Sequence, residues 1–194
     1  MSVQKKNKIK VMPVDDHPVV LEGVRSCLRG NAQFDVVGTA CDGEDAIAKS
    51  KKLSPDVILM DIQMPGIDGL EATRRLRQAC PRAKVLMFAG REDNDAVGEM
   101  IQCGAKGCIR KSASAAELVS AIERVHRGET FFSPDVAQTF FEIGPGSLIL
   151  ALQAQDLSVT VQEIGKDRLV LGLASQREGL LHHFSGGGQI AHGC

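Results

Sequence analysis

Carboxylates follow two short apolar runs of this sequence, and their spacing could support metal-dependent chemistry. Asp61 comes directly after Val57–Met60, and Asp15 and Asp16 come directly after the largely apolar run Ile9–Val14. Runs of this kind are typical of strands that are buried on both faces of a parallel sheet. The carboxyl ends of parallel strands meet at one edge of the sheet, where ligands bind in open α/β folds. We therefore expect these carboxylates to converge at that edge.

A lysine is expected at the same edge of the sheet. Val85–Phe88 and Gly107–Ile109 are two more strand candidates, and the second leads into Arg110 and Lys111. Crowded carboxylates repel one another unless a cation joins them. An all-oxygen site with open positions suits Mg²⁺, which keeps several waters and takes phosphate oxygens as ligands. Asp61 is then a candidate nucleophile that accepts a phosphoryl group, and Lys111 is a positive charge for a phosphoryl oxygen.

Asp61 could instead cap a helix, because aspartate is common before helices. Pro65 and Gly66 force a turn after it, and Gly66 and Gly69 leave the backbone above it free of bulk. Its convergence with distant carboxylates and a lysine favours the metal site over the cap. His17 lies at the start of the first predicted helix, and we expect it to cap or pack rather than to catalyse.

Strand and helix patterns alternate from Ile9 to about Gly128, which predicts an α/β fold with a doubly wound, five-stranded parallel sheet. In the flavodoxin-like strand order the site falls at the switch point beside the first strand, where Asp61 is expected. The predicted strands are 9–14, 34–39, 57–60, 84–88 and 107–109. The predicted helices are 19–28, 44–52, 70–77, 93–104 and one that follows 112–114 and ends near 128.

The composition is that of a nearly neutral chain with scattered cysteines. The formal net charge is −1, so charge alone gives no case for nucleic acid or a membrane surface. The 6 cysteines form no Cys-x-x-Cys pair, which argues against zinc and for reduced thiols. Met1–Lys10 lacks the apolar core of a signal peptide, and no apolar run approaches the ~20 residues of a membrane helix. We expect a soluble, cytoplasmic protein.

Three segments resemble a known family. Val14–Pro18, Asp56–Gly69 and Gly104–Ser112 are similar to the motifs of the receiver domain of bacterial two-component response regulators, in order and with family-like spacing. The subgroup most resembled is the NarL/FixJ class, whose members also carry a LuxR-type helix-turn-helix. The resemblance covers roughly the first two-thirds of the chain.

The resemblance implies a role for each site residue. It implies that a sensor histidine kinase donates a phosphoryl group to Asp61, so that the protein is a phosphoacceptor rather than an enzyme. It places Mg²⁺ among Asp15, Asp16, Asp61 and the carbonyl of Gln63, with Asp16 as a direct ligand and Asp15 acting through water. It implies that Lys111 binds a phosphoryl oxygen. It also implies transcription regulation through DNA, and it allows a homodimer.

Two positions depart from the family pattern. Receivers usually carry serine or threonine after the fourth strand, where this sequence has Ala89, and an aromatic residue on the fifth strand, where it has Cys108. That hydroxyl normally moves to bond the phosphoryl group, and the aromatic side chain swings inward with it. A ligand shifts a two-state equilibrium only through contacts that differ between the states. We therefore expect a phosphate acceptor whose switching is weak or follows another route.

The C-terminal part supports three interpretations. Leu157–Ile164 and Arg168–Leu173 alternate apolar and polar residues around Gly165–Asp167, which indicates a β-hairpin. The same stretch also resembles a damaged LuxR-type helix-turn-helix and, more faintly, the RNA-binding carbon storage regulator family. We divide the chain into a receiver domain, a short helix with a linker, and a degenerate helix-turn-helix region, at 1–128, 129–156 and 157–194.

We predict that this chain does not bind DNA specifically. Specific recognition needs a stable helix that delivers several side chains to base edges. The segment where that helix belongs, Ser185–Cys194, holds three consecutive glycines and no lysine or arginine. Each glycine costs about 1 kcal/mol relative to alanine in a helix. His182, His183, His192 and Cys194 could be imagined as a metal cluster, but a glycine-rich terminus gives them no supporting structure.

Two other functions share these residues. A Mg²⁺-dependent phosphohydrolase of the haloacid dehalogenase type also uses an aspartate and a lysine, but it places its aspartates as Asp-x-Asp after one strand, whereas Asp15 and Asp16 are adjacent. A constitutive interaction module of receiver fold is the other, and Ala89 and Cys108 motivate it. The response regulator is the leading hypothesis.

Overall fold

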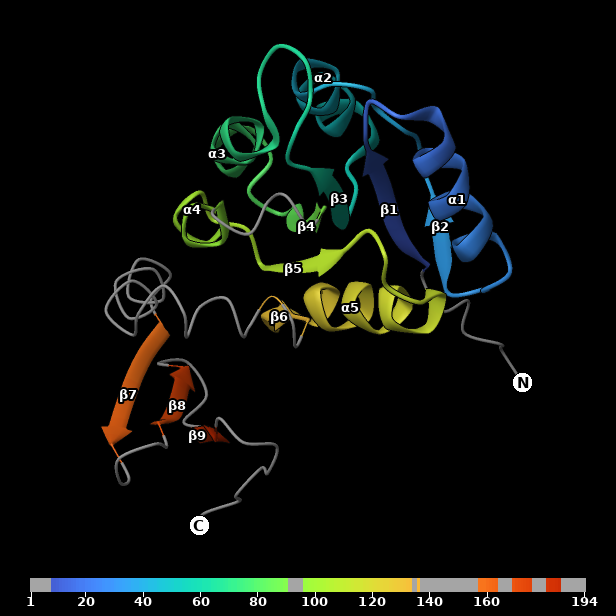
Figure 1. Ribbon diagram of the computed structural model, residues 1–194. Helices are drawn as coiled ribbons and strands as arrows, with labels where there is room; N and C mark the ends of the chain where they lie inside the picture. Colours follow the sequence, from blue (N-terminus) through green and yellow to red (C-terminus); the bar gives the residue numbers. More distant parts are fainter. Residues whose placement is uncertain are drawn as a thin grey trace, which may run out of the picture. The chain divides into compact units, whose positions relative to one another are not determined.

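Two separate units make up the chain, Met1–Glu142 and Ile143–Cys194. The computed structural model describes residues 8–90, 96–133, 136, 157–163, 169–175 and 181–185. In the first unit, helices cover both faces of a parallel sheet (Figure 1). The expected functional residues of the receiver motifs all belong to this unit.

The sheet of the first unit has six strands in the order β2-β1-β3-β4-β5-β6. All of its strand pairs are parallel. This order confirms the predicted flavodoxin-like, doubly wound α/β fold and adds one strand to the five expected. The strands are β1 (Ile9–Val14), β2 (Phe34–Val36), β3 (Val57–Asp61), β4 (Lys84–Ala89), β5 (Gly107–Arg110) and β6 (Phe131–Phe132).

Five helices alternate with these strands, and three of them begin with a side-chain cap. Asp42, Asp68 and Ser114 each accept a hydrogen bond from the backbone N–H three residues on, which satisfies a donor that has no partner inside the helix. No helix in the described part of the chain is long and apolar enough to cross a membrane. The helices are α1 (Pro18–Arg29), α2 (Gly43–Leu53), α3 (Gly69–Ala79), α4 (Val97–Gln102) and α5 (Ala115–Arg127).

One core cluster lies between the sheet and two helices, α1 and α5. Apolar residues at helical spacing on these helices meet alternate residues of the strands, which is the packing that a buried parallel sheet requires. Every residue of β3 is buried, so the strand that carries Asp61 is the fixed centre of the sheet. The α1 and α5 contributions to the cluster are Val24, Leu28, Leu118, Ala121, Ile122 and Val125.

The chain after α5 differs from its predicted local structure. Phe131–Phe132 lies in the segment predicted as a short helix with a linker, 129–156, but it pairs with β5 as a parallel strand. The Phe131 amide donates to the Lys106 carbonyl at 3.1 Å, and the Ser133 amide donates to the Cys108 carbonyl at 3.1 Å. Aromatic residues favour strands, and the free side of β5 supplies the partners. The rest of the predicted helix and the linker lie outside the described residues, apart from Val136, which is buried.

The described residues of the second unit form a three-stranded antiparallel sheet in the order β7-β8-β9. Its strands are β7 (Leu157–Glu163), β8 (Leu169–Ser175) and β9 (Leu181–Ser185). The pairing of β7 with β8 closes on Glu163 and Leu169, as the hairpin interpretation expects. Within 157–163, 169–175 and 181–185 there is no helix, so the first helices of the alternative motif are not found there.

Candidate functional site

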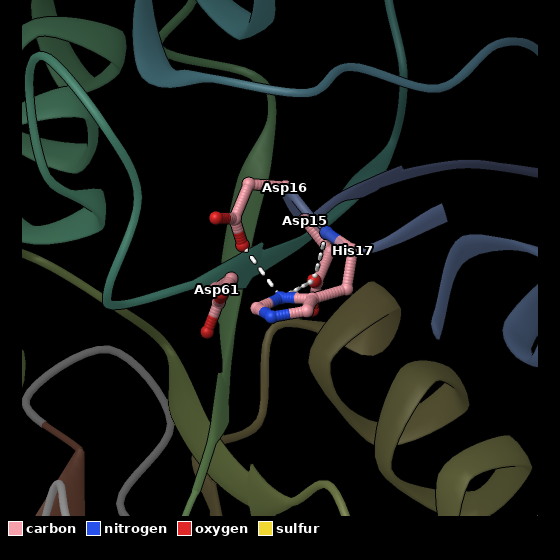
Figure 2. A group of neighbouring side chains, drawn as sticks. All are labelled: Asp15, Asp16, His17 and Asp61. Atoms are coloured by element: carbon pink, nitrogen blue, oxygen red, sulfur yellow. Dashed lines mark hydrogen bonds and ion pairs between the residues drawn. The ribbon is translucent and has the colours of Figure 1, made fainter. Parts of the chain in front are cut away.

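The candidate site lies at the carboxyl edge of the central strands. Asp61 ends β3, Asp15 and Asp16 follow β1, and Lys111 follows β5. Because β1 and β5 flank the pair β3 and β4 in the sheet, residues almost 100 positions apart in the sequence meet here. Figure 2 shows the side chains of Asp15, Asp16, His17 and Asp61 gathered together at this edge. The predicted convergence of the carboxylates is what the sheet order produces.

One ammonium group joins two buried carboxylates. The Lys111 Nζ atom lies 2.8 Å from Asp61 Oδ1 and 2.9 Å from Asp15 Oδ2. The side chains of both aspartates are only 2% exposed, whereas that of Lys111 is 26% exposed. A charge-assisted contact of this kind is stronger than a neutral hydrogen bond. The lysine therefore compensates part of the negative charge that folding buries here.

The pKa direction of Asp61 indicates that this carboxylate remains short of positive charge. Burial raises the pKa of Asp61 above 3.8, the hydrogen bond from Lys111 opposes this shift, and the nearby Asp15 charge adds to it. Burial lowers the pKa of Lys111, but its hydrogen bonds to Asp61 and Asp15 outweigh burial and raise the pKa above 10.5. Lys111 therefore stays charged, and a second cation at this site would favour the ionised form of Asp61.

The turn after β3 holds Asp61 in one position. The Ile62 amide donates to Asp61 Oδ1 at 2.8 Å, and the Gly69 amide donates to the Ile62 carbonyl at 2.8 Å. A Cβ on Gly69 would lie 1.9 Å from the Asp61 carbonyl oxygen, so only glycine fits at the start of α3. Gly66 has a φ of +81°, which other residues rarely adopt. The two glycines that the sequence placed above Asp61 are therefore needed for the tight turn.

His17 contacts the acidic pair. Its Nδ1 atom lies 2.7 Å from Asp16 Oδ1 and 3.2 Å from Asp15 Oδ1, and its backbone N–H donates to Asp15 Oδ1 at 2.9 Å (Figure 2). His17 occupies the N-cap position of α1, but its side chain makes no capping hydrogen bond. Sequence reasoning missed the ring contact. The sequence feature that could have predicted this contact is that Asp15, Asp16 and His17 are consecutive in the chain.

The donor set fits a hard divalent cation. Asp15, Asp16, His17 and Asp61 each offer one ligand atom, and these atoms lie within 4.8 Å of one another. The Asp61 Oδ2 atom is buried and finds no hydrogen-bond partner among the described residues. A buried carboxylate oxygen without a partner is costly, so the site suits a ligand that supplies one. Gln63 is exposed in the turn after β3, and the part of its carbonyl in metal binding stays a prediction.

The two atypical positions are buried on neighbouring strands of the sheet. Ala89 and Cys108 are both 0% exposed and lie on the neighbouring strands β4 and β5. In the register of these strands Cys108 pairs with Met87, and Ala89 pairs with Arg110. Arg110 is 6% exposed, and its Nη1 atom donates to the Gly90 carbonyl at 2.5 Å. Sequence reasoning gave Arg110 no role.

The four residues imagined as a C-terminal metal cluster are not brought together in the described part of the chain. His182 and His183 are neighbours on β9. His192 and Cys194 lie outside the described residues. The groups of possible metal ligands found among the described residues contain none of the four.

A parallel sheet of this order, with an aspartate ending its central strand, an acidic pair after β1 and a lysine after β5, defines a receiver-type signalling domain. Residues 11–123 match the model of the response regulator receiver domain. The chain therefore belongs to the response regulator receiver family of two-component signalling. Members of this family are signalling proteins rather than classical enzymes.

Characterised relatives support the same family and subgroup. The chain is 42% identical over 130 residues to the response regulator GacA of Pseudomonas syringae pv. syringae (strain B728a), a match that covers 67% of this chain and 61% of that protein. It is 40% identical over 130 residues to the response regulator UvrY of Escherichia coli (strain K12), covering 67% of this chain and 60% of that protein. The chain thus matches less than two-thirds of the length of these relatives.

Solved structures agree with this assignment. A LuxR-family two-component response regulator from Aurantimonas sp. SI85-9A1 is 36% identical with a TM-score of 0.66, over 71% of this chain and 98% of that one. A structure of RcsB dimers bound to DNA is 25% identical with a TM-score of 0.65, over 77% of this chain and 78% of that one. The resemblance to the NarL/FixJ class of receivers is confirmed.

Proposed function

We propose that Asp61 accepts a phosphoryl group from a sensor histidine kinase, and that this chain acts as a phosphorylated signalling domain. One observation carries the proposal: Lys111 Nζ bridges Asp61 and Asp15, while Asp61 Oδ2 has no hydrogen-bond partner in the described part of the chain. Asp61 Oδ1 is held by Lys111 and by the Ile62 amide. Oδ2 is therefore the oxygen available to attack phosphorus.

The transfer moves a phosphoryl group from nitrogen to oxygen. A new O–P bond forms at Asp61 Oδ2 as the N–P bond of the donor phosphohistidine breaks, and the bonding electron pair stays on the imidazole. Negative charge builds on the equatorial phosphoryl oxygens during such a transfer, and fixed positive charge stabilises it. Lys111 supplies that charge from the side of β5. Its raised pKa keeps it protonated throughout.

We propose Mg²⁺ as the cofactor of this site. Asp15, Asp16, Asp61 and the carbonyl of Gln63 would hold it, with Asp16 as a direct ligand and Asp15 acting through water. The oxygen-rich donor set, whose ligand atoms lie within 4.8 Å of one another, supports this choice. When bound, the ion neutralises the carboxylates and the incoming phosphoryl oxygens.

The partners and the setting of the chain follow from its relatives. We propose a sensor histidine kinase as the donor, a cytoplasmic location and a capacity to form homodimers, since RcsB is described as a dimer on DNA. We propose that this chain does not bind DNA specifically, because Ser185–Cys194, where the recognition helix belongs, holds three consecutive glycines and no lysine or arginine. Residues 186–194 of that segment lie outside the described residues. We also propose the division into a receiver, a linker and a degenerate output region at 1–128, 129–156 and 157–194.

Phosphorylation by a small donor tests the proposal directly. With Mg²⁺ and a small phosphate donor, the wild type should gain an acid-stable acyl phosphate that borohydride traps, and Asp61→Asn should gain none. Asp35→Asn is the matched control, because Asp35 is an exposed aspartate on β2. It should be labelled like the wild type. Equal labelling of Asp61→Asn, or none of the wild type, would refute the assignment.

A constitutive interaction module is the second candidate. Ala89 and Cys108 are fully buried and carry neither the hydroxyl nor the aromatic ring of the usual switch. Self-association and partner binding should then be the same with and without a beryllofluoride mimic of the phosphoryl group. A phosphohydrolase would instead turn over a generic phosphate ester many times, and a single slow turnover would exclude it.

A further inference from the structure

Arg110 is a buried cation beside the candidate site. It ends β5, it is 6% exposed, and its Nη1 atom donates to the carbonyl of Gly90 at 2.5 Å. An arginine cannot lose its proton in a protein, so folding has buried a permanent charge here. Burying a charge is costly unless strong partners surround it. A residue with only a packing role would be expected to be apolar at this position.

The register of the sheet places Arg110 next to the row that holds Asp61. Asp61 pairs with Phe88, and Phe88 pairs with Ile109, so these three residues lie in one row across β3, β4 and β5. Ala89 and Arg110 form the next pair toward the carboxyl edge. Neighbouring strands lie about 4.8 Å apart, which puts the backbone of Arg110 roughly 10 Å from that of Asp61. Asp61 shares the face of Phe88 and Ile109, so a contact between its phosphoryl group and Arg110 passes over the carboxyl edge of the sheet, where β3 and β5 both end.

Arg110 also lies on the face of the sheet that holds the atypical positions. Successive strand residues point to opposite faces, so Cys108 and Arg110 share one face and Ile109 takes the other. Ile109 packs in the cluster with α1 and α5. Arg110 therefore leaves the sheet on the opposite face, paired with Ala89, where receivers usually present a hydroxyl. The side chain that this chain offers at that place is a guanidinium.

We propose that Arg110 detects the phosphorylated state of Asp61, in place of the absent hydroxyl at Ala89. The inference rests on the proposed function. A phosphoryl group adds about −1.5 to −2 charge and three acceptor oxygens. A charged acceptor binds a guanidinium more strongly than a backbone carbonyl does. Phosphorylation moves the guanidinium from the Gly90 carbonyl to a phosphoryl oxygen, and this contact differs between the two states.

The consequence of this exchange falls on the chain that leaves β4. Gly90 is the first residue after β4, and the Arg110 hydrogen bond fixes its carbonyl in the unphosphorylated protein. The adjoining Ala89 carbonyl accepts the Lys111 amide at 2.9 Å, and this backbone contact does not involve the guanidinium. Departure of the guanidinium removes this hydrogen bond from Gly90 while the pairing of β4 with β5 persists. The signal therefore starts at Gly90.

Beryllofluoride binding in the presence of Mg²⁺ tests the proposal, with the backbone amide signals of the full chain followed by nuclear magnetic resonance. In the wild type the amides of Gly90 and Arg110 should shift on binding. Arg110→Met should bind beryllofluoride about tenfold more weakly, which corresponds to about 1.4 kcal/mol, and its Gly90 signal should no longer respond. Arg75→Met is the matched control, because Arg75 is an exposed arginine on α3. It should behave like the wild type.

Two further variants separate a sensing role from a structural one. Arg110→Lys keeps the charge but loses the planar pair of donors, so it should retain the fold and bind with intermediate affinity. It decides the question if Arg110→Met does not fold. Ala89→Ser restores a hydroxyl, and in the Arg110→Met background it should recover most of the lost affinity and the response of Gly90.

The outcomes distinguish this inference from the proposed function. A folded wild type that does not bind beryllofluoride with Mg²⁺ would remove the proposed function itself. A wild type that binds, together with folded Arg110 variants of unchanged affinity and an unchanged Gly90 response, would overturn the role of Arg110 alone. Failure of Ala89→Ser to compensate would also contradict it, because the two residues would then not share one task.

Discussion

Removal of the Lys111 charge is the most direct test of the site's electrostatics. In Lys111→Met the two buried carboxylates of Asp61 and Asp15 lose the ammonium that lies 2.8 and 2.9 Å from them. Breaking a buried ion pair by removing one partner costs about 3–5 kcal/mol. Lys111 is 26% exposed, so water screens part of the loss, and we expect the lower end of that range. Acid should restore stability, because protonated carboxylates no longer repel one another.

Urea unfolding followed by the helical signal in circular dichroism measures this loss. The chain has no tryptophan or tyrosine, so intrinsic fluorescence offers little, whereas every helix named in the structure lies in the first unit. The helical signal therefore reports on the domain that carries the site. Lys52→Met is the matched control, because Lys52 is an exposed lysine on α2. Its free energy of unfolding should stay within about 0.5 kcal/mol of the wild type.

Mg²⁺ gives a second measure of the same charge balance. A ligand that binds only the folded state stabilises it in proportion to the logarithm of its concentration over its dissociation constant. Mg²⁺ should therefore stabilise Lys111→Met at least as much as it stabilises the wild type, since the variant holds more uncompensated negative charge. The reasoning would be refuted if, at near-neutral pH, Lys111→Met had the same free energy of unfolding as the wild type and if acid did not increase the free energy of unfolding of the variant.

Three further predictions concern single positions. Burial raises the pKa of Asp61 above 3.8, so the folded state binds this proton more tightly than the unfolded state does. The wild type therefore loses stability as the pH rises through the raised pKa. In denaturant titrations across the acid range, the free energy of unfolding of Asp61→Asn should increase relative to that of the wild type as the pH rises. Gly107→Ala should disrupt the pairing of β5 with β6, because its Cβ would lie 2.1 Å from a β6 carbonyl oxygen, whereas Gly23→Ala has open space; amide exchange of β6 and thermal unfolding of both variants would show the contrast. Ser114→Ala removes the cap of α5 and should lower the free energy of unfolding by about 1 kcal/mol, measured with urea.

The order of the strands and the place of the site could be predicted because both depend on strong local patterns. The apolar runs before Asp15 and Asp61 mark buried strands, and parallel pairing brings their carboxyl ends together whatever the details of packing. Glycine at positions 66 and 69 marked the tight turn. The direct contacts of Lys111 with both aspartates follow from the same sheet order.

The remaining features depend on tertiary contacts, which no short stretch of the sequence contains. The hydrogen bond from Arg110 joins β5 to Gly90, the residue after β4, and strand alternation gives the face on which the side chain leaves the sheet but not its hydrogen-bond partner. β6 has only two residues, so its existence depends on the free side of β5 and on the space that Gly107 leaves. The ring of His17 bonds the acidic pair rather than the helix end, a choice between two nearby partners.

The strand β6 has a consequence for where the chain can be cut. It supplies β5 with its outer hydrogen-bond partner, from the Phe131 amide on Lys106 to the Ser133 amide on Cys108. A truncation after residue 128 would leave β5 as an edge strand, with unpaired backbone groups open to other chains. Such a fragment should self-associate through that edge, whereas one that ends after Val136 should remain dispersed. The segment that leaves the receiver therefore also protects it from aggregation.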